Sequence, residues 1–402
     1  MKKGKNIWVI NQVAGNPESG WGERHYYLSK KWIEDGYNVW IVSGSYNHMF
    51  KNFPVTEGQY TLENFEGTNF CWVKCPKYDP KSILRFYSMI VFALKILFLP
   101  NRKLGRPDSI IVSSMPIFPI FSGWLLKLRF SSKLIFEIRD LWPLTPIHLM
   151  NLSRYNPMIM LIAWLEKLGY RKSDFIVSLL PNSFNYINSI SRKPEKFRWI
   201  PNGISQELMV EEALPNEIVQ MIPRDKFIIG YTGTMGIANA LNYLVDAARL
   251  LKGKQEIHFV LVGDGYRKPY LEADSKNLNN ITFIPKISKN QVNQMLQYFD
   301  VCFIGRNNTK LFDHGVSSNK YFDYMLAKKP ILVSSNGIKC PVELANAGLI
   351  VNPESGKDIM NGILELFNAT QEERNEYGSN GFKYVKKNHI FSLLSDKYSS
   401  LF

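Results

Sequence analysis

Short runs of apolar residues alternate with longer amphipathic segments along the first half of the chain. The runs occupy residues 7–10, 39–42, 110–112, 134–138 and 175–179, and they are rich in Ile, Val and Phe. Strands that are covered on both faces are apolar throughout, whereas strands with one face in water alternate between apolar and polar residues. The pattern therefore predicts a parallel, doubly wound α/β sheet with helices on both faces.

The alternation starts again after a polar interval. Further apolar runs occupy residues 227–232, 258–262, 281–284, 301–304, 331–333 and 349–351. A chain of 402 residues, 45% of them hydrophobic, is long enough to fill two cores. Because turn residues at 199–204 and a polar stretch at 211–215 separate the two series, we predict a first domain at 1–203 and a second at 222–388.

Positive charge is concentrated in one part of the first domain. The formal net charge is +14, and within residues 80–136 one acid, Asp108, stands against nine basic residues: Lys81, Arg85, Lys95, Arg102, Lys103, Arg106, Lys127, Arg129 and Lys133. No helix-turn-helix or RNP signature accompanies the charge, so a nucleic-acid partner is not expected. Anionic lipid and phosphate-bearing substrates remain as partners.

An apolar segment at residues 83–99 lies inside this basic region. Arg85 and Lys95 interrupt it, so it lacks the run of ~18 apolar residues that a spanning helix requires. Its basic flanks fit a helix adsorbed on an anionic leaflet, and they fit a core helix with solvated ends equally well. The sequence leaves both interpretations open.

The sequence lacks several motifs, and these absences limit the reactions and cofactors that we expect. The cysteines (Cys71, Cys75, Cys302 and Cys340) are expected to be reduced thiols without metal, because no histidine lies at ligand spacing from them. The sequence contains no Asp-x-Asp triplet, the usual carboxylate pair that holds a divalent ion on a nucleotide diphosphate, so metal-independent chemistry is expected. The N-terminus runs directly into a strand without a signal-type apolar region, which predicts a cytoplasmic protein.

A glycine-containing turn follows the first strand. Gly20 and Gly22 do not form a dinucleotide fingerprint, because the third glycine and an acid after the second strand are both missing. NAD and FAD are therefore not expected. The two glycines, with Arg24 and His25 beside them, remain candidates for contacts to another substrate.

Two loops of the second predicted domain carry small residues at the ends of strands. Gly233, Thr234 and Gly236 follow the strand 227–232, and Gly263 and Asp264 follow the strand 258–262. Small residues let the backbone approach a diphosphate closely. Because the carboxyl ends of parallel strands share one edge of a sheet, we expect these loops to converge.

A third segment of this domain begins a helix. Ser317 or Ser318 is the expected N-cap, Asn319 follows, and Lys320 and Asp323 then lie three residues apart on one face (sequence 317–323). The helix N-terminus and the lysine could neutralise a diphosphate, while the aspartate could accept the ribose hydroxyls. An ordinary surface salt bridge is the alternative interpretation.

Taken in order along the chain, these segments resemble family 4 of the retaining GT-B glycosyltransferases, most closely the bacterial O-antigen and capsule enzymes that include fucosaminyl transferases. The resemblance is carried by residues 24–30, 138–143, 200–203, 231–236, 262–265 and 318–325. It implies two Rossmann-like domains facing a central cleft, with the last helix, 389–402, packing back on the first domain. It also implies a nucleotide-sugar donor bound by the second domain.

The chain departs from the family pattern at several positions. Family members commonly have two acids separated by seven residues; here Asp323 matches the second, which contacts ribose, and Gly315 stands at the first, which contacts the sugar. Thr234 and Ala240 stand where many members place an Arg and a Lys on the diphosphate, so the expected replacements for this charge are Lys320, Arg306 and Lys310.

A first-domain strand ends in Arg139-Asp140 where many relatives have His-Asp. The resemblance therefore implies Arg139, Asp140, His25 and Lys320 as catalytic candidates, with Arg24 near the acceptor phosphate.

The expected function is retaining transfer of a sugar from a nucleoside diphosphate, with UDP as the expected nucleotide, and without a cofactor. The basic first domain suggests a polyprenyl-diphosphate-linked saccharide as acceptor, and hence an enzyme held on the cytoplasmic face of the cell membrane. Two alternatives remain: a nucleotide-sugar epimerase or hydrolase on the same scaffold, and a non-catalytic partner in a membrane assembly.

Overall fold

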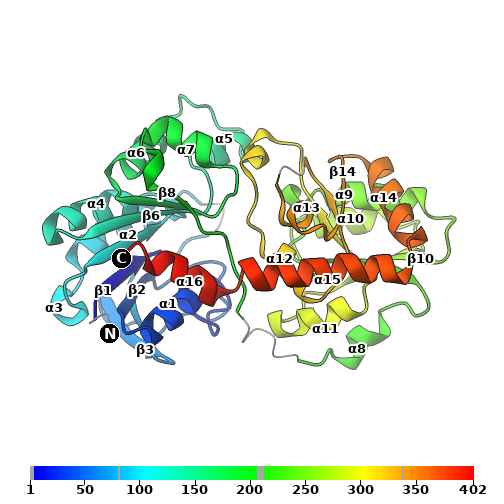
Figure 1. Cartoon of the computed structure of the whole chain (residues 1–402), viewed down its shortest axis with the longest axis horizontal. Helices are drawn as coiled ribbons and strands as arrows, with labels where there is room; N and C mark the ends of the chain where they lie inside the picture. Colours follow the sequence, from blue (N-terminus) through cyan, green and yellow to red (C-terminus); the bar gives the residue numbers. More distant parts are fainter. Residues whose placement is uncertain (1–3, 80–81, 206–211, 337–338) are drawn as a thin grey trace. The chain divides into compact units, whose positions relative to one another are not determined.

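The computed structural model describes residues 4–79, 82–205, 212–336 and 339–402. The chain forms two compact units (Figure 1). Unit 1 extends to Asn202 and includes the C-terminal segment Phe391–Phe402, and unit 2 comprises Gly203–Ile390. The predicted boundary region includes residues 206–211, and Lys81 belongs to the predicted basic region; both lie outside the described residues.

Unit 1 is built on an eight-stranded sheet with the order β3-β4-β2-β1-β5-β6-β7-β8. All neighbouring strands are parallel except β3 and β4. Its strands are β1 Asn6–Ile10, β2 Asn38–Gly44, β3 Tyr60–Phe65, β4 Thr68–Val73, β5 Ser109–Ser113, β6 Lys133–Ile138, β7 Phe175–Ser178 and β8 Phe197–Trp199. Its helices are α1 Arg24–Glu34, α2 Leu84–Lys95, α3 Asn101–Leu104, α4 Pro119–Phe130, α5 Leu144–Leu149, α6 Pro157–Lys172, α7 Phe184–Ser191 and α16 Phe391–Ser399.

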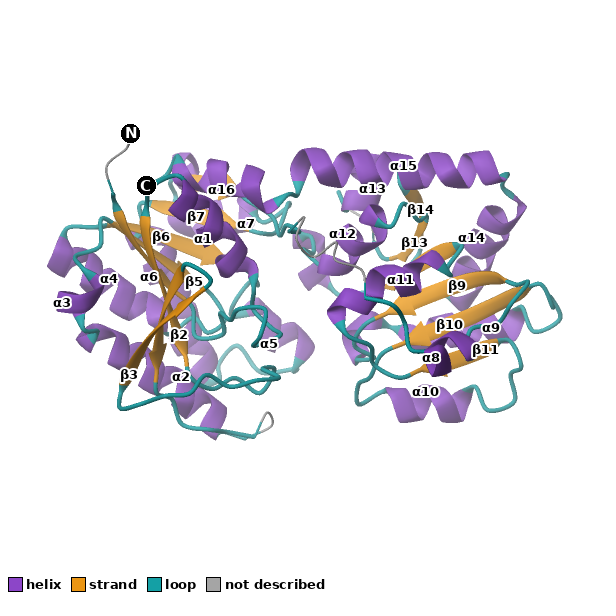
Figure 2. Ribbon diagram, turned by 90° about the horizontal axis from the view of Figure 1, so that it is seen from below, coloured by secondary structure: helices purple, strands orange, loops and turns teal. Residues whose placement is uncertain are grey.

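Unit 2 contains a fully parallel six-stranded sheet with the order β11-β10-β9-β12-β13-β14. Its strands are β9 Phe227–Thr232, β10 Ile257–Val262, β11 Ile281–Ile284, β12 Val301–Gly305, β13 Ile331–Ser334 and β14 Gly348–Val351. Its helices are α8 Asn216–Gln220, α9 Leu241–Leu250, α10 Lys268–Asp274, α11 Val292–Gln297, α12 Asn319–Leu326, α13 Pro341–Ala345, α14 Gly356–Asn368 and α15 Gln371–Asn388. Figure 2 shows the strands of this sheet between helical layers.

The prediction of two doubly wound α/β sheets is confirmed. Every apolar run predicted as a strand forms one, with ends that differ by at most two residues. The predicted runs do not include β4, β8 or β3, a half-buried edge strand that pairs antiparallel with β4. After the Gly233 loop a 3₁₀ turn, Ile237–Asn239, comes first, and α9 starts at Leu241 after Ala240 adopts φ +46.

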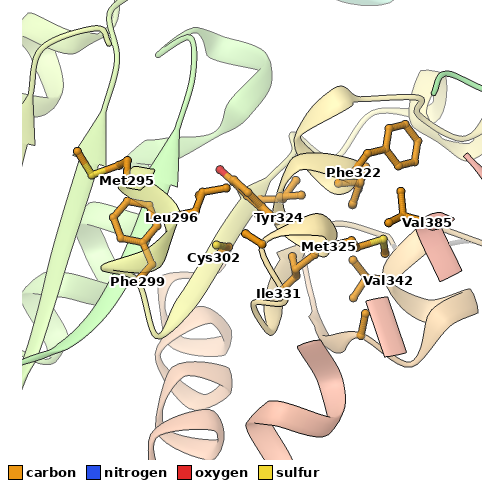
Figure 3. Packing of buried hydrophobic residues seen from close by; sticks show 14 of the residues in the cluster. Met295, Leu296, Phe299, Cys302, Phe322, Tyr324, Met325, Ile331, Val342 and Val385 are labelled. Atoms are coloured by element: carbon orange, nitrogen blue, oxygen red, sulfur yellow. The ribbon is translucent and has the colours of Figure 1, made fainter. Parts of the chain in front are cut away.

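The core of unit 2 consists of two apolar layers, one on each face of the sheet. One layer contains side chains of α11, α12, α13 and α15, and the other contains side chains of α9, α10 and α14. Figure 3 shows part of the first layer, where Phe299 and Cys302 pack near Tyr324 and Ile331. Gly230 in β9 is required by this packing, because a Cβ there would lie 1.9 Å from the ring of Phe299.

The segment Phe391–Phe402 completes unit 1. Helix α16 packs on α1, where the Trp32 indole donates to the carbonyl of Ser395 at 3.1 Å and the Ser395 hydroxyl donates to the carbonyl of Leu28 at 3.1 Å. The Tyr27 and Phe391 rings stack with centroids 5.5 Å apart. Unit 1 is therefore assembled from two segments of the chain that are separated by the whole of unit 2.

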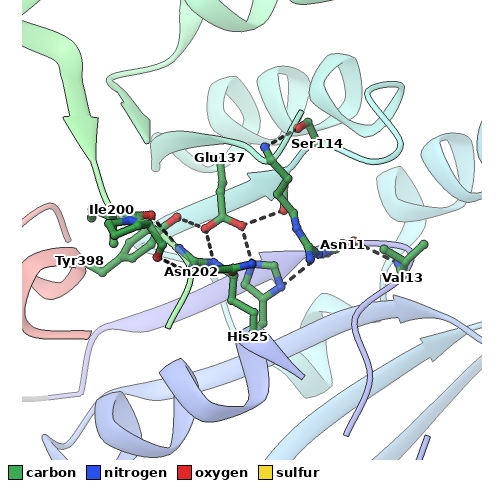
Figure 4. Close-up of polar contacts among 12 residues, drawn as sticks. Asn11, Val13, His25, Ser114, Glu137, Ile200, Asn202 and Tyr398 are labelled. Atoms are coloured by element: carbon green, nitrogen blue, oxygen red, sulfur yellow. Dashed lines mark hydrogen bonds and ion pairs between the residues drawn. The ribbon is translucent and has the colours of Figure 1, made fainter. Parts of the chain in front are cut away.

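A buried carboxylate, Glu137 at the end of β6, connects these segments (Figure 4). Its oxygens lie 3.1 Å from Arg24 Nε, 2.9 Å from His25 Nε2 and 2.5 Å from the Tyr398 hydroxyl. Burial alone would raise the pKa of Glu137, but Arg24 and His25 outweigh it and hold the pKa well below its ordinary value. The Arg24 guanidinium also donates to the carbonyls of Ile200 and Pro201.

Removing this carboxylate should selectively destabilise unit 1. Glu137→Ala leaves the Arg24 guanidinium buried without its counter-ion, which should lower the free energy of unfolding by about 3–5 kcal/mol. Tyr398→Phe removes one hydrogen bond to a charged group and should cost about 1.5–3 kcal/mol.

Tryptophan fluorescence during urea unfolding measures both effects, because all nine tryptophans lie in unit 1. Lys31→Ala is the control, since its bridge to Asp35 lies on the surface and should contribute less than about 0.5 kcal/mol. A Glu137→Ala protein with the wild-type midpoint would contradict the account.

Candidate functional site

The two glycine loops predicted in unit 2 lie against each other. The amide of Gly233 donates to the carbonyl of Val262 at 2.9 Å, and the amide of Met235 donates to the carbonyl of Asp264 at 2.8 Å. Gly263 has φ +142, and a Cβ on it would lie 2.0 Å from the carbonyl oxygen of Gly233. Only glycine fits at Gly263, because both the space and the backbone conformation exclude a side chain.

These loops lie at a preferred position for ligands in this class of sheet. The chain order reverses between β9 and β12, which are neighbours in the sheet. The Gly233 loop follows β9, and Arg306 follows β12. Ligands of doubly wound sheets bind beyond the carboxyl ends of the strands at such a switch point.

Lys320, in the first turn of α12, extends across the Gly233 loop. Its Nζ lies 2.6 Å from the Tyr231 hydroxyl, 3.1 Å from Asn239 Oδ1 and 4.3 Å from the centroid of the Tyr231 ring. A Cβ on Gly233 would lie 2.5 Å from Lys320 Cε. The structure thus brings together the lysine turn and the glycine loop, which are far apart in the sequence.

Two cations meet at this position. Arg306 is buried, with 8% exposure, and Lys320 is partly exposed. Burial and, to a smaller extent, Arg306 together lower the pKa of Lys320 to about 7, with Asp323 opposing the shift. Within the described residues neither cation has a carboxylate at ion-pair distance, and Arg306 Nε has no hydrogen-bond partner. An anion placed here would supply the missing counter-charge.

Asp323 pairs with a residue that the sequence did not indicate. Both of its carboxylate oxygens lie 2.6 Å from Lys289 Nζ, and Lys289 belongs to the 3₁₀ turn Lys289–Gln291. The alternative to a nucleotide site was an ordinary salt bridge. Asp323 does form a salt bridge, but with Lys289 and not with Lys320. The carboxylate nevertheless lies one helical turn from Lys320, in the same α12.

The other predicted residues of unit 2 occupy different positions around these loops. The carbonyl of Thr234 accepts hydrogen bonds from the Tyr231 hydroxyl and from Asn239 Nδ2, and Gly236 precedes the turn Ile237–Asn239. Asp264 is exposed and accepts from the amide of Gly265. Lys310 is also exposed, at the start of the 3₁₀ turn Lys310–His314.

The predicted start of α12 is confirmed. Ser318 is its N-cap, although its side chain makes no capping hydrogen bond, with Ser317 before it and Asn319 as the first helical residue. No pattern in the sequence singles out Tyr231, Asn239 or Lys289 as site residues. Tyr231 and Asn239 flank the predicted loop, but their contacts with Lys320 depend on the packing of α12 against β9.

In unit 1 the predicted site residues fall into two groups. Arg24 and His25 are enclosed with Glu137: the His25 ring has Glu137 on Nε2 and the Asn11 amide on Nδ1, 3.2 Å away. Burial lowers the pKa of His25, with Glu137 opposing the shift. The structure gives both residues a role in holding unit 1 together, and their predicted catalytic and acceptor roles stay predictions.

Arg139 and Asp140 form the second group, just beyond the carboxyl end of β6. Both are partly exposed, and among the described residues their side chains have no hydrogen-bond or ion-pair partner. Burial raises the pKa of Asp140, and Arg139 opposes this shift. These two charged groups are therefore available for a ligand of unit 1.

Gly20 and Gly22 shape the turn that precedes α1. Their φ angles are +67 and +81, and a Cβ on Gly22 would lie 2.1 Å from the carbonyl oxygen of Val13. The amide of Gly15 donates to the carbonyl of Gly22 across this turn. The turn itself explains why both positions are glycine, and contact with a substrate stays a prediction.

Two further features concern metals and membranes. Among the described residues no group of three His, Cys, Asp or Glu side chains is arranged to hold a metal ion. No helix in the described part of the chain combines the length and the apolar composition needed to cross a membrane.

Comparisons with known proteins agree with this geometry. Residues 226–369, all within unit 2, match the family model for Glycosyl transferases group 1. No curated protein matches the chain. Unit 2 is therefore similar to the glycosyl transferases of group 1 over residues 226–369.

Solved structures resemble the chain over its full length. Sucrose-phosphate synthase from Thermosynechococcus elongatus aligns with a TM-score of 0.75 and 17% identity, covering 99% of this chain and 98% of that one. Anabaena HepE in complex with UDP-glucose aligns at 0.66 and 13%, covering 98% of each chain. WaaG, a glycosyltransferase involved in lipopolysaccharide biosynthesis, aligns at 0.67 and 13%, covering 98% and 99%. At such identities the likeness shows the fold alone, and it confirms the predicted GT-B fold.

A methyl group at Gly263 should disrupt the contact between the two loops. Gly263→Ala combines a strained backbone with a clash against the Gly233 carbonyl, so we expect unit 2 to lose roughly 1–3 kcal/mol or more of stability. Faster hydrogen exchange at residues 231–236 should accompany the loss. Gly253→Ala is the matched control, because a Cβ there meets nothing within 4 Å. Equal exchange rates in the two variants would argue against the close contact.

Proposed function

We propose that the protein is a retaining glycosyltransferase that takes a sugar from a nucleoside diphosphate, with UDP as the nucleotide. The observation that carries the proposal is the pair of cations, Lys320 and Arg306, held beside the Gly233 loop without a carboxylate partner in the described residues. The family match of unit 2 supports the proposal. The similarity in fold to Anabaena HepE, which was solved in complex with UDP-glucose, supports it as well.

In this proposal the diphosphate lies between the Gly233 loop and the first turn of α12. The amides of the loop and of the helix N-terminus, together with the two cations, would stabilise the negative charge that develops as the bond between the sugar and the diphosphate breaks. The nucleoside diphosphate leaves with the electron pair of the broken bond, the acceptor oxygen bonds to the sugar, and the proton of the acceptor hydroxyl passes to water or to a phosphate oxygen. Because fixed cations meet this charge, the proposal does not call for a divalent ion.

Asp323 is assigned to the ribose. Its carboxylate accepts from Lys289 in the structure, and a carboxylate has enough lone pairs to accept ribose hydroxyls as well. Gly315, in the position of the first family acid, has no side chain with which to contact the sugar. The choice of sugar is therefore assigned to other groups around the site.

For the acceptor we propose a polyprenyl-diphosphate-linked saccharide of bacterial surface polysaccharide synthesis, used at the cytoplasmic face of the cell membrane. The basic side chains of unit 1 and the unpartnered Arg139 support this assignment, because both offer positive charge to a diphosphate. The likeness to WaaG concerns the fold alone. Unit 1 is accordingly assigned to the acceptor and unit 2 to the donor.

The ribose assignment can be separated from a purely structural salt bridge. Asp323→Ala should weaken UDP binding by about 10- to 150-fold, which corresponds to about 1.5–3 kcal/mol for hydrogen bonds to a charged group. Lys289→Ala removes the same salt bridge but keeps the carboxylate, so UDP affinity should stay within about threefold of wild type. Calorimetric titration gives both values. 2′,3′-dideoxy-UDP should bind more weakly than UDP to the wild type and to Lys289→Ala, whereas Asp323→Ala should bind the two nucleotides equally. Equal losses in Asp323→Ala and Lys289→Ala would reject the ribose contact.

The lowered pKa of Lys320 predicts a pH dependence of donor binding. A bound diphosphate favours the ammonium form and raises the pKa above 7, so above this pH binding must take up a proton. The affinity for UDP-glucose, whose diphosphate does not titrate near neutrality, should fall as pH rises from 7 to 9, by up to about tenfold per unit.

Lys320→Arg is the matched control, because its guanidinium stays charged throughout this range. Its pH profile should be flat, and Lys320→Ala should bind weakly at every pH. A flat wild-type profile, or a slope that persists in Lys320→Arg, would contradict the assignment of Lys320 to the diphosphate.

A further inference from the structure

Three neighbouring helices of unit 1 expose apolar side chains to solvent. Helix α2 packs against α4, and α4 packs against α6. The large apolar residues exposed on them, and on the turns directly joined to them, are Ile83, Leu84, Tyr87, Ile90, Leu94, Phe98, Leu128, Met160, Leu161 and Trp164. We call this surface the α2–α4–α6 face.

Helix α2 is apolar on two sides. Ser88, Met89, Phe92 and Ala93 are buried on the inner side. The outer residues Leu84, Tyr87, Ile90 and Leu94 recur every three or four positions, so they form a single stripe in water. The segment that could have been a core helix or a membrane-adsorbed one is therefore a surface helix with an uncovered apolar side.

Aromatic contacts continue this surface from α4 to α6. The Phe121 ring lies 6.0 Å from the Trp164 ring and 6.0 Å from the Trp124 ring, measured between centroids. The Lys172 ammonium lies 5.9 Å from the centroid of Trp124. The apolar side chains of the two helices thus meet, with a cation at their border.

The charge on these helices, and on α3, which follows α2 in the chain, is almost entirely positive. Helices α2, α3, α4 and α6 contain a single acid, Glu166, and nine basic residues: Arg85, Lys95, Arg102, Lys103, Lys127, Arg129, Lys167, Arg171 and Lys172. Glu166 is buried and accepts from Tyr170 at 3.0 Å and from Tyr186 at 2.9 Å. Burial raises the pKa of Glu166 to about 8, so this carboxyl adds no negative charge to the face at neutral pH.

We propose that the α2–α4–α6 face binds an anionic lipid bilayer, with its apolar side chains at the boundary between headgroups and acyl chains and its basic side chains on the lipid phosphates. A bilayer satisfies both observations, because adsorbed helices gain from apolar burial and from attraction to anionic lipid. A second copy of the chain would bring two basic surfaces together, which like charges oppose. This inference rests on the proposed function and identifies the surface by which the enzyme would contact the membrane that holds its acceptor.

The direction of the helices places the apolar residues in their N-terminal halves near the predicted acceptor residues. Helices α4 and α6 each follow a strand of the parallel sheet, so their first turns lie at the carboxyl edge of the strands. Met160 and Trp164 belong to the first half of α6, and Asp140 follows β6 at the same edge. The basic residues of the last turns lie at the opposite end of the helices.

Co-sedimentation of the full chain with vesicles tests the proposal. Binding to phosphatidylcholine vesicles should rise steeply as phosphatidylglycerol is added and should fall with salt. Arg102→Gln/Lys103→Gln/Lys172→Gln should weaken binding roughly 100-fold, since each basic residue near an anionic surface contributes about fivefold. Tyr87→Ser/Leu94→Ser/Met160→Ser should weaken it at least tenfold and should abolish the quenching of tryptophan fluorescence by lipids brominated in the acyl chain.

Matched controls come from exposed positions in unit 2. Leu250→Ser/Tyr270→Ser and Lys252→Gln/Lys254→Gln/Lys276→Gln change the same kinds of side chain and should bind vesicles like the wild type. Wild-type tryptophan fluorescence and urea midpoints in the absence of lipid would show that the face variants fold.

Three results would overturn the proposal: no binding to phosphatidylglycerol vesicles, equal effects of face and control variants, or a concentration-dependent dimer that the face variants abolish. UDP titration of the same proteins keeps the two proposals apart. Face variants should bind UDP normally, so loss of UDP binding with intact vesicle binding would reject the donor site alone.

Discussion

The central constraint in unit 2 is the burial of positive charge beside a strand end. Arg306 is almost fully removed from water and lies close enough to lower the pKa of Lys320, and the described residues give neither side chain a carboxylate partner. Burying two such cations costs free energy, which the protein recovers only in part through the Tyr231 hydroxyl and Asn239. Because part of this free-energy cost remains in the free protein, the site should favour a ligand of negative charge.

The glycine loops make this arrangement possible. Gly233 must leave room for the Lys320 side chain, and Gly263 must leave room for the backbone of Gly233. Each glycine removes an obstacle for the next segment, so the three loops form one surface although they are separated in the sequence. In many family 4 members an Arg and a Lys follow this loop. Here Thr234 and Ala240 stand at those positions, and the positive charge beside the loop belongs to Arg306, after β12, and to Lys320, in the first turn of α12.

The sequence predicted the features that depend on local pattern. Continuous apolar runs located the strands from β1 to β14, apart from β3, β4 and β8, because strands covered on both faces need such runs. The loops of the candidate site followed from the strand ends, and the N-cap of α12 was predicted at Ser317 or Ser318, of which Ser318 occupies it. Edge strand β3 was not predicted, because its alternating polar residues resemble those of a loop.

The sequence could not predict side-chain contacts that depend on tertiary packing. Lys289 meets Asp323, and Glu137 meets Arg24, His25 and Tyr398, across separations that no spacing rule covers. The same limit applies to exposure: residues 83–99 suited either a core or a surface helix, and only the packing of α2 on α4 showed which side faces water.

The split composition of unit 1 has a consequence for biosynthesis. Helix α16 leaves the ribosome only after every residue of unit 2 has been made. Until then the nascent first sheet lacks the tyrosine that binds Glu137 and the apolar cover over α1, while unit 2 already has all of its own strands. During translation, unit 2 can therefore reach its final structure before unit 1, and chaperones have more reason to hold the earlier-made part than the later one.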